Sequence, residues 1–322
     1  MDRPRAVAEL RTALTRFARE VDDGWDHWCV ALSGGADSLA LAAVAAGLKP
    51  TTALIVDHRL QPGSGGVAAA ARAQALQLGC TAARILTAEV GDAGGPEGAA
   101  RVARYRALRD AHDGAPVLLA HTLDDQAETV LLGLGRGSGA RSIAGMRIAD
   151  PPWYRPLLGV RRAVTAAACV ELGLTPWRDP HNTDPRFTRS RLRAEALPLL
   201  EEVLGGGVAA ALARTADALR EDTDALDGLA EAAFRDAVCE TGLDTARLSG
   251  LPTAIRRRVI RRWLTAQGAG ALTDRHLRAV DALVTHWRGQ GGVAVPGGRT
   301  RERLIAGRRD GRLTMSVEPV DR

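Results

Sequence analysis

Short apolar runs alternate with helical patterns over the first half of the chain. The runs that predict buried strands are 27–32, 52–57, 83–86 and 116–121. The predicted helices are about 1–23, 38–46, 67–78, 97–111 and 124–132. This alternation is typical of a doubly wound α/β fold, in which mainly parallel strands are joined by helical crossovers.

The pattern changes after about residue 176. A long helical pattern at 208–240 has apolar residues at alternating steps of four and three, as in the seam of a helix pair. The elements predicted after it are helices at about 253–266 and 273–287 and short strands at 292–295, 303–306 and 313–317. We therefore expect three parts: an α/β domain at 1–176, a polar connector at 177–205, and a mainly α-helical domain with a small β element at 206–322.

The composition of the chain favours some kinds of binding site and argues against others. Lys49 is the only lysine in the chain, so the net charge of +5 comes from arginine, which binds phosphate well in a bidentate manner. The four cysteines contain no Cys-x-x-Cys pair, which argues against a zinc ribbon or an iron–sulfur cluster and favours buried thiols. No stretch approaches the ~20 apolar residues of a membrane helix, and no signal-peptide core is evident, so we expect a cytoplasmic protein.

A glycine-rich turn follows the first predicted strand and opens a helix. The turn consists of Ser33, Gly34, Gly35, Ala36, Asp37 and Ser38. Free backbone N–H groups and the helix dipole make such a place suitable for phosphate, and the glycines let the main chain approach the anion. A carboxylate there repels phosphate unless a cation intervenes, so Asp37 indicates Mg²⁺. The alternative interpretation is an ordinary turn in which Asp37 caps the helix.

Polar residues also follow the second and fourth strands. They are Asp57 and His58 after the second, and His121, Asp124, Asp125 and Glu128 after the fourth. The carboxyl ends of parallel strands meet at one edge of a sheet, so we expect these residues and the turn to line one cleft. The three acids could simply complement a helix N-terminus. As a crowded group they instead suggest a bound cation, either a metal or an ammonium group.

Several motifs carry a resemblance to a known family. They include Ser-Gly-Gly-x-Asp-Ser at 33–38, Val-Asp-His-Arg-Leu at 56–60, His-x-x-Asp-Asp-Gln-x-Glu-Thr at 121–129, Arg-Pro-Leu-Leu at 155–158 and Trp-Arg-Asp-Pro-His-Asn-Thr-Asp at 177–184. In this order and setting, the chain resembles the tRNA(Ile)-lysidine synthase family of the PP-loop ATP pyrophosphatase superfamily. The resemblance covers about residues 27–205.

The resemblance implies a reaction and roles for individual residues. It implies that ATP adenylates C2 of cytidine 34 in the CAU anticodon of tRNA(Ile), with release of pyrophosphate, and that free L-lysine then displaces AMP. Residues 33–38 with Asp57 and His58 are then expected to bind ATP, and Asp37 to bind Mg²⁺. Asp37, His121, Asp124, Asp125 and Glu128 become the catalytic candidates. The sequence leaves open which of these carboxylates holds lysine or metal.

Arginine clusters predict contacts with RNA phosphates. The connector contributes Arg186, Arg189, Arg191 and Arg193, and further clusters lie at 256–262 and 299–312. Three alternatives stay open: a tRNA 2-thiolase, a synthetase that amidates a small molecule, and a catalytically silent tRNA-binding protein. The lack of a cysteine pair counts against the first, the arginine-rich second domain against the second, and the intact acids against the third.

Overall fold

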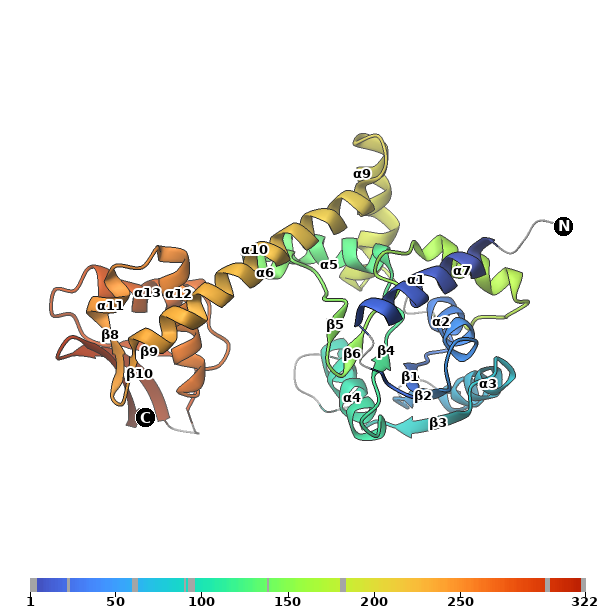
Figure 1. Cartoon of the computed structure of the whole chain (residues 1–322), viewed down its shortest axis with the longest axis horizontal. Coiled ribbons are helices and arrows are strands. Elements are labelled where there is room, and N and C mark those ends of the chain that lie inside the picture. Colours follow the sequence, from blue (N-terminus) through green and yellow to red (C-terminus); the bar gives the residue numbers. More distant parts are fainter. Residues whose placement is uncertain are drawn as a thin grey trace. The chain divides into compact units, whose positions relative to one another are not determined.

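A computed structural model describes residues 5–21, 24–59, 63–89, 91, 96–137, 139–179, 184–298 and 302–319. By packing, the chain divides into two compact units (Figure 1). Unit 1 comprises residues 1–132 and 145–216, and unit 2 comprises 133–144 and 217–322. The expected connector, 177–205, therefore packs within unit 1, and the division falls inside the long helix α10 (Val208–Ala237).

Unit 1 is built on a six-stranded sheet. Its strands are β1 (Trp28–Ala31), β2 (Thr51–Asp57), β3 (Ala82–Thr87), β4 (Val117–Leu118), β5 (Ala149–Asp150) and β6 (Trp153–Tyr154). Their order is β3-β2-β1-β4-β6-β5, and all neighbours are parallel except β5 and β6. This confirms the predicted doubly wound sheet. The β5–β6 hairpin was not predicted, because two-residue strands leave no recognisable period of two.

Helices enclose the sheet of unit 1. They are α1 (Arg5–Val21), α2 (Ala36–Ala46), α3 (Ser64–Gln77), α4 (Pro96–Ala111), α5 (Leu123–Gly135), α7 (Arg162–Glu171), α8 (Thr188–Arg191) and α9 (Leu197–Val203), with a π-helical turn at Leu192–Ala196. Alternate residues of β1 face opposite cores. Trp28 and Val30 pack with α1, α2 and α3, while Cys29 packs with Leu108 of α4 on the other face. Burial on both faces explains why this strand reads as continuously apolar.

The strand order also positions the loops. From β1 the chain moves outward through β2 to β3, and then returns to place β4 on the other side of β1. Ligands of open α/β sheets bind at the carboxyl ends of the strands where the order reverses. In this sheet that point lies between β1 and β4, so the loops that follow these two strands flank it.

Unit 2 combines helices with a five-stranded antiparallel sheet. The helices are α6 (Ala140–Ile143), α11 (Thr245–Ser249), α12 (Thr253–Ala266) and α13 (Asp274–Thr285), and the strands are β7 (Val238–Cys239), β8 (Gly242–Asp244), β9 (Val293–Val295), β10 (Glu302–Arg309) and β11 (Arg312–Pro319). The sheet order is β7-β8-β11-β10-β9. The predicted helices and the last three strands are confirmed. The β7–β8 hairpin was not predicted, because its strands have only two and three residues.

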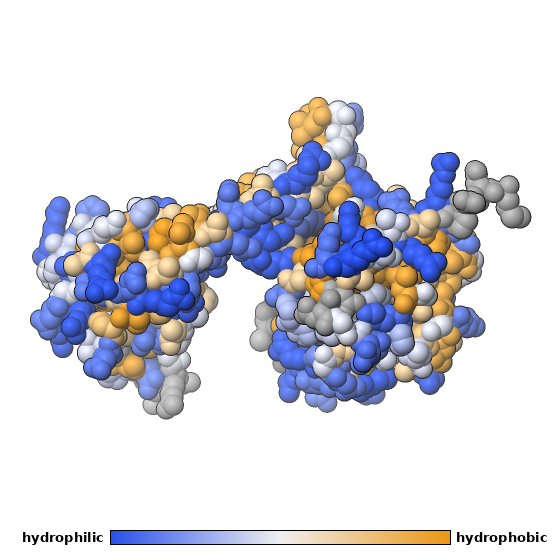
Figure 2. Space-filling view, viewed as in Figure 1, coloured by the Kyte–Doolittle hydropathy of each residue, from blue (hydrophilic) through white to orange (hydrophobic). Residues whose placement is uncertain are grey.

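Apolar side chains are exposed at the end of α9, at the top of the view in Figure 2. They belong to Leu199, Val203 and Leu204. Over the described residues, no single helix is long and apolar enough to cross a membrane, and only the bent pair Thr188–Val203 and Val208–Ala237 passes that test when its parts are taken together.

Candidate functional site

The turn at 33–38, the PP-loop, joins β1 to α2. Its serines hold it from within, because the Ser33 N–H donates to Ser38 Oγ at 3.2 Å and Ser38 Oγ donates to the Gly35 carbonyl at 2.9 Å. Among the described residues, no side-chain hydrogen bond caps the N-terminus of α2. The N–H groups of its first turn therefore have no acceptor within the helix, which leaves them available for an anion.

The segment that follows α7 braces the PP-loop. The Trp177 N–H donates to the Gly34 carbonyl at 2.9 Å. Gly34 has a φ of +81°, and a Cβ there would lie 3.8 Å from the Trp177 Cβ. The positive φ explains the glycine at this position. The contact also brings the start of the tryptophan motif at 177–184 to the PP-loop, although residues 180–183 of that motif lie outside the described residues.

Asp37 lies in the first turn of α2 but does not act as its N-cap. The Thr165 hydroxyl of α7 donates to Asp37 Oδ1, and Arg162 Nε lies 3.7 Å from Asp37 Oδ2. Burial raises the pKa of the Asp37 carboxyl, and the Thr165 hydrogen bond and Arg162 offset part of that rise. The capping alternative is therefore wrong for Asp37. One carboxylate beside a phosphate site suits Mg²⁺, which takes one or two carboxylates together with phosphate and water.

Asp125, at the start of α5, caps the helix and also contacts Arg162. Its Oδ2 accepts hydrogen bonds from the Thr122 N–H and hydroxyl, both at 2.8 Å, in a capping-box arrangement. Its Oδ1 accepts a hydrogen bond from Arg162 Nη2 at 2.7 Å. Burial alone would raise the pKa of Asp125, but Arg162 and the Thr122 hydrogen bonds outweigh it and lower the pKa. The alternative that the acids complement the helix N-terminus thus holds for Asp125, and it does not exclude a role in the site.

Glu128, one turn further along α5, is fully buried among arginines. Arg193 Nε donates to its Oε1 at 2.9 Å and Arg193 Nη2 to its Oε2 at 3.3 Å. Arg162 donates to Oε1 at 3.2 Å, and Arg189 Nη1 lies 4.0 Å from Oε2. Arg193 lies on the π-helical turn and Arg189 on α8, so this carboxylate attaches the arginine-rich segment to α5.

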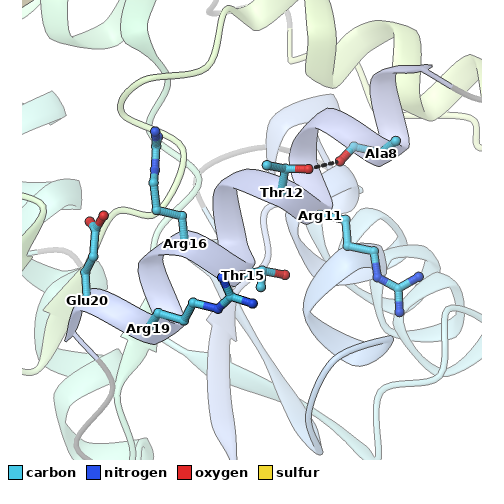
Figure 3. A pocket seen from close by; sticks show the side chains of 7 residues that line it. All are labelled: Ala8, Arg11, Thr12, Thr15, Arg16, Arg19 and Glu20. Atoms are coloured by element: carbon cyan, nitrogen blue, oxygen red, sulfur yellow. Dashed lines mark hydrogen bonds between the residues drawn. The ribbon is translucent and has the colours of Figure 1, made fainter.

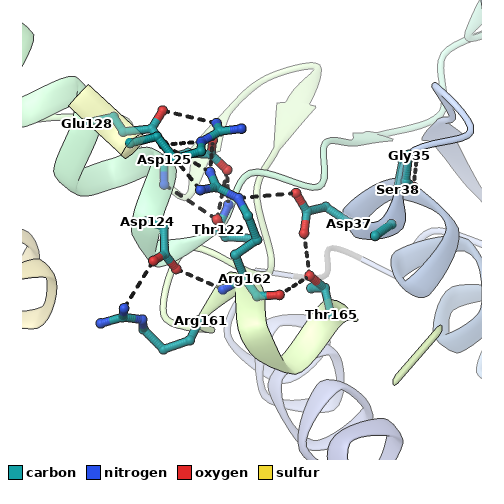
Figure 4. Close-up of polar contacts among 12 residues, drawn as sticks. Gly35, Asp37, Ser38, Thr122, Asp124, Asp125, Glu128, Arg161, Arg162 and Thr165 are labelled. Atoms are coloured by element: carbon teal, nitrogen blue, oxygen red, sulfur yellow. Dashed lines mark hydrogen bonds and ion pairs between the residues drawn. The ribbon is translucent and has the colours of Figure 1, made fainter. Parts of the chain in front are cut away.

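Asp124 faces the start of α7 (Figure 4). Its Oδ2 accepts the Arg162 backbone N–H at 2.8 Å, and Arg161 Nη2 lies 3.2 Å from its Oδ1. Arg162 therefore contacts all four predicted acids, three through its guanidinium and Asp124 through its main chain. The structure brings Asp37 to the α5 acids, as predicted.

The cation that the crowded acids require is arginine. The four carboxylates of Asp37, Asp124, Asp125 and Glu128 are matched by the guanidinium groups of Arg161, Arg162, Arg189 and Arg193. The sequence interpretation considered only a metal or a bound ammonium group, and it missed Arg161, Arg162 and Thr165. A tandem arginine pair two residues after the Arg-Pro-Leu-Leu motif was the available signal.

His121 lies beside a second group of cations. Burial lowers the pKa of His121 to about 3, with Arg104, Arg155 and Arg101 contributing. The imidazole is therefore neutral at pH 7, and its buried Nδ1 has no hydrogen-bond partner among the described residues. His58, after β2, has a pKa lowered by burial and by the same Arg104, and its buried Nδ1 also lacks a described partner.

Arg104 of α4 lowers the pKa of both histidines through its charge and was not predicted as a site residue. Burial and the nearby Arg101 and Arg189 lower its pKa, and no carboxylate pairs with it among the described residues. A partly buried guanidinium without an acid is a suitable place for a negatively charged group.

Asp57, at the end of β2, makes a contact within the loop that follows it. Its Oδ1 accepts a hydrogen bond from the Arg59 N–H at 2.9 Å, and this hydrogen bond lowers the pKa of Asp57.

The four connector arginines divide into two pairs. Arg189 and Arg193 point into the acid cluster, as described above. Arg186 and Arg191 are exposed, and each pairs with a nearby acid: Arg186 with Asp184 at 2.6 Å and Arg191 with Glu195 at 2.8 Å. The second pair is the more accessible to a large polyanion, since Arg186 and Arg191 expose 81% and 61% of their side chains and Arg189 and Arg193 expose 36% and 35%.

Many arginines of unit 2 are committed to internal contacts. Arg256 is buried and pairs with Asp281 at 2.6 Å, so it belongs to the core. Arg258 pairs with Asp227 at 2.8 Å, and Arg308 donates to the Leu283 carbonyl at 3.0 Å. Of the predicted clusters, Arg299 and Arg301 lie outside the described residues.

Among the described residues, neither the cysteines nor the cavity along α1 forms a second candidate site. Cys29, Cys80 and Cys169 are buried and Cys239 is half-buried, and no group of three or more His, Cys, Asp or Glu suited to a metal occurs among the described residues. A shallow cavity of about 730 Å³ lies along the exposed face of α1 (Figure 3). Its lining includes Arg11, Arg16 and Arg19 but none of the predicted site residues.

Comparison with known proteins agrees with the geometry of the site. A family model described as "PP-loop domain" matches residues 8–200, and one described as "TilS substrate binding domain" matches residues 243–314. The chain is 67% identical to the tRNA(Ile)-lysidine synthase of Mycobacterium tuberculosis (strain ATCC 25618 / H37Rv) over 324 residues, which covers 99% of this chain and 100% of that protein. It is 61% identical to the enzyme of the same name from Mycobacterium leprae, with the same coverage.

A solved structure resembles the fold at low sequence identity. It is the U34-tRNA thiolase NcsA from Methanococcus maripaludis with its 4Fe–4S cluster, with a TM-score of 0.54 and 18% identity. The likeness covers 67% of this chain and 80% of that one. It supports the PP-loop fold of unit 1.

Proposed function

This chain belongs to the tRNA(Ile)-lysidine synthase family, and we propose from that premise how its residues carry out the reaction. The chain is an ATP-using ligase that modifies tRNA. In the proposed reaction it joins free L-lysine to C2 of cytidine 34 in the CAU anticodon of tRNA(Ile). The observation that carries the proposal is the convergence of the PP-loop and the α5 acids at the switch point of the sheet.

The reaction has two steps that balance. First, the C2 oxygen of cytidine attacks the α-phosphorus of ATP, which forms an adenylated tRNA and releases pyrophosphate. Then the ε-amine of lysine attacks C2, the C2–oxygen bond breaks, AMP leaves and the amine gives up a proton. AMP is a far better leaving group than the original oxygen, so two accessible steps replace one that is prohibitively slow.

ATP binds in this proposal at the PP-loop, residues 33–38. The N–H groups of the first turn of α2 receive phosphate oxygens, and Asp37 supplies the carboxylate ligand of Mg²⁺, which neutralises phosphate charge. Asp57 and His58 lie at the end of the neighbouring strand and border the nucleotide. Arg104, between His58 and His121, receives negative charge from the phosphates or the adenylated base.

The acid cluster serves the lysine side of the reaction. Asp124 and Asp125 keep exposed side-chain area, 16% and 14%, and are the candidates for contact with an amino group of lysine. Glu128 has none, so it acts through Arg162 and Arg193. A neutral His121 can accept a hydrogen bond near the reacting base.

The cluster arrangement also reconciles two demands on lysine. Unpaired carboxylates would raise the pKa of a bound amine above its ordinary ~10.4, whereas attack requires the neutral amine. Arginine partners cancel much of that effect. The cluster can then orient lysine through hydrogen bonds without holding it as a cation.

The tRNA is held by exposed arginines in this proposal. Arg186 and Arg191 contact phosphates after exchanging their acid partners, while Arg189 and Arg193 act beside the acid cluster. Unit 2, which contains the segment matched by the substrate-binding model, contributes the remaining RNA contacts.

The test is incorporation of labelled lysine. The protein is incubated with ATP, labelled lysine and a CAU-anticodon tRNA(Ile) transcript, with a transcript altered at position 34 as control. We expect label in the first RNA only, together with pyrophosphate and AMP in equal amounts. Absence of label from the first RNA, under conditions where ATP is bound, would refute the proposed reaction.

A further inference from the structure

One side chain joins the two halves of the site. The Arg162 guanidinium contacts Asp125 Oδ1 at 2.7 Å, Glu128 Oε1 at 3.2 Å and Asp37 Oδ2 at 3.7 Å. Asp37 belongs to the PP-loop after β1, whereas Asp125 and Glu128 belong to α5 after β4. In the described part of the chain, the guanidinium of Arg162 is the one that pairs with both elements.

The main chain of Arg162 strengthens this link. It is the first residue of α7, and its N–H donates to Asp124 Oδ2 at 2.8 Å. Its carbonyl lies 2.8 Å from the Thr165 hydroxyl, which also contacts Asp37. The first turn of α7 is therefore anchored to α5 on one side and to the PP-loop on the other (Figure 4).

The chemistry of arginine suits this task. A guanidinium group presents five N–H donors in one plane and can bind several carboxylates in fixed directions, whereas an ammonium group is a single point charge. Arg162 keeps 24% of its side chain exposed, and its contacts with the acids restrict its rotation. Its donors are directed at protein carboxylates, which leaves it a poor phosphate ligand.

We propose that Arg162 is a positioning residue that fixes Asp37 of the PP-loop relative to the acids of α5. It thereby aligns the ATP half of the site with the half that receives lysine and the cytidine. This inference rests on the proposed function. Arg162 touches neither substrate, and its effect on the reaction passes through the four carboxylates.

The test separates the two half-reactions in Arg162→Met, which keeps an unbranched apolar side chain but removes every donor. Pyrophosphate release is measured with ATP and tRNA alone, and lysine incorporation with all substrates. A misplacement of about 1 Å can cost about 100-fold in rate. We therefore expect kcat to fall by about 100-fold in both measurements, with the KM for tRNA within about threefold of the unsubstituted protein.

Arg162→Lys and Arg84→Met complete the design. The lysine variant keeps one positive charge, but its ammonium group cannot contact both the PP-loop and α5. Its kcat should therefore lie about tenfold above that of Arg162→Met and about tenfold below that of the unsubstituted protein. Arg84 pairs with Asp113 at the same 2.7 Å in unit 1 but away from the site, and its loss should leave kcat unchanged. If Arg162→Met does not fold, the lysine variant carries the test: a kcat about tenfold below that of the unsubstituted protein, at unchanged KM for tRNA, supports the proposal.

Two results would overturn the proposal. Unchanged kcat with a lowered melting temperature would make Arg162 a structural ion pair only. A raised KM for tRNA with a shallower salt dependence would make it a phosphate contact. Failure of the proposed function is distinguishable, because it would appear in the unsubstituted protein as pyrophosphate release without lysine incorporation.

Discussion

Replacing Glu128 by glutamine removes one buried charge and almost no volume. In the native protein the carboxylate faces Arg162 at 3.2 Å, Arg193 at 2.9 Å and Arg189 at 4.0 Å, and it has no exposed area. The glutamine amide can replace some hydrogen bonds, but it cannot compensate the two nearest guanidinium groups. Arg162 would keep Asp125 and Asp37, but Arg193 would keep only a 3.6 Å contact with Asp125, so part of the buried positive charge would be left uncompensated, which is the costly part of the change.

The magnitude follows from these distances. One contact near 3 Å is worth about 5 kcal/mol at an effective dielectric constant of ~20, before desolvation is subtracted. Removing one partner of a buried pair costs about 3–5 kcal/mol in practice. For a unit of roughly 200 residues, this corresponds to a fall in melting temperature of roughly 6–20 °C.

The assay is thermal and urea unfolding of Glu128→Gln at pH 7. Glu202→Gln, an exposed substitution in the same unit, serves as the control and should change stability by less than about 0.5 kcal/mol. Adding Arg193→Met to Glu128→Gln should recover about 0.5–3 kcal/mol, because a second charge is then removed. If Glu128→Gln is as stable as the unsubstituted protein, the buried cluster does not hold α5 to the arginine segment.

Three further predictions concern pH, backbone and ATP. His121 has a pKa of about 3 in the folded state and ~6.5 in the unfolded state, so between these pH values only the unfolded state binds the proton. Lowering the pH from 7 to 5 should therefore reduce the free energy of unfolding, measured in urea, by about 2 kcal/mol. The variant His121→Gln should lose that part of the pH dependence. Gly145→Ala should lower the melting temperature more than Gly173→Ala. Both glycines have a positive φ, but a Cβ at 145 would lie 2.7 Å from Gln126, whereas a Cβ at 173 would meet nothing within 4 Å. Equal effects would contradict this packing. Asp37→Asn should reduce pyrophosphate release by at least about 100-fold while tRNA binding in a filter assay stays within about threefold, and retained release would remove Asp37 from the ATP site.

The fold of unit 1 was accessible from the sequence because its strands are long or buried on both faces. Strand β1 reads as apolar throughout, since Trp28 and Cys29 enter cores on opposite sides. The same argument fails for β5 and β6. Each has two residues, and their pairing with each other and with β4 depends on tertiary context that no local pattern contains.

The sequence predicted only part of the candidate site. The acids of α2 and α5 were found because they follow strands whose carboxyl ends meet. Their partners were not, because Arg162 lies 37 residues beyond Asp125 in the sequence and Arg193 lies 65 beyond Glu128. Sequence spacing shows that crowded carboxylates need a cation, and only the folded chain shows that the cation is a guanidinium group.

The balance of four acids against four arginines restricts how this site can change during evolution. A substitution of Glu128 alone leaves the cluster with excess positive charge, and a substitution of Arg193 alone leaves it with excess negative charge, so either one should be selected against. Joint replacement avoids that penalty. Among related enzymes these two positions should therefore be exchanged together, and a lineage that has lost one should also have lost the other.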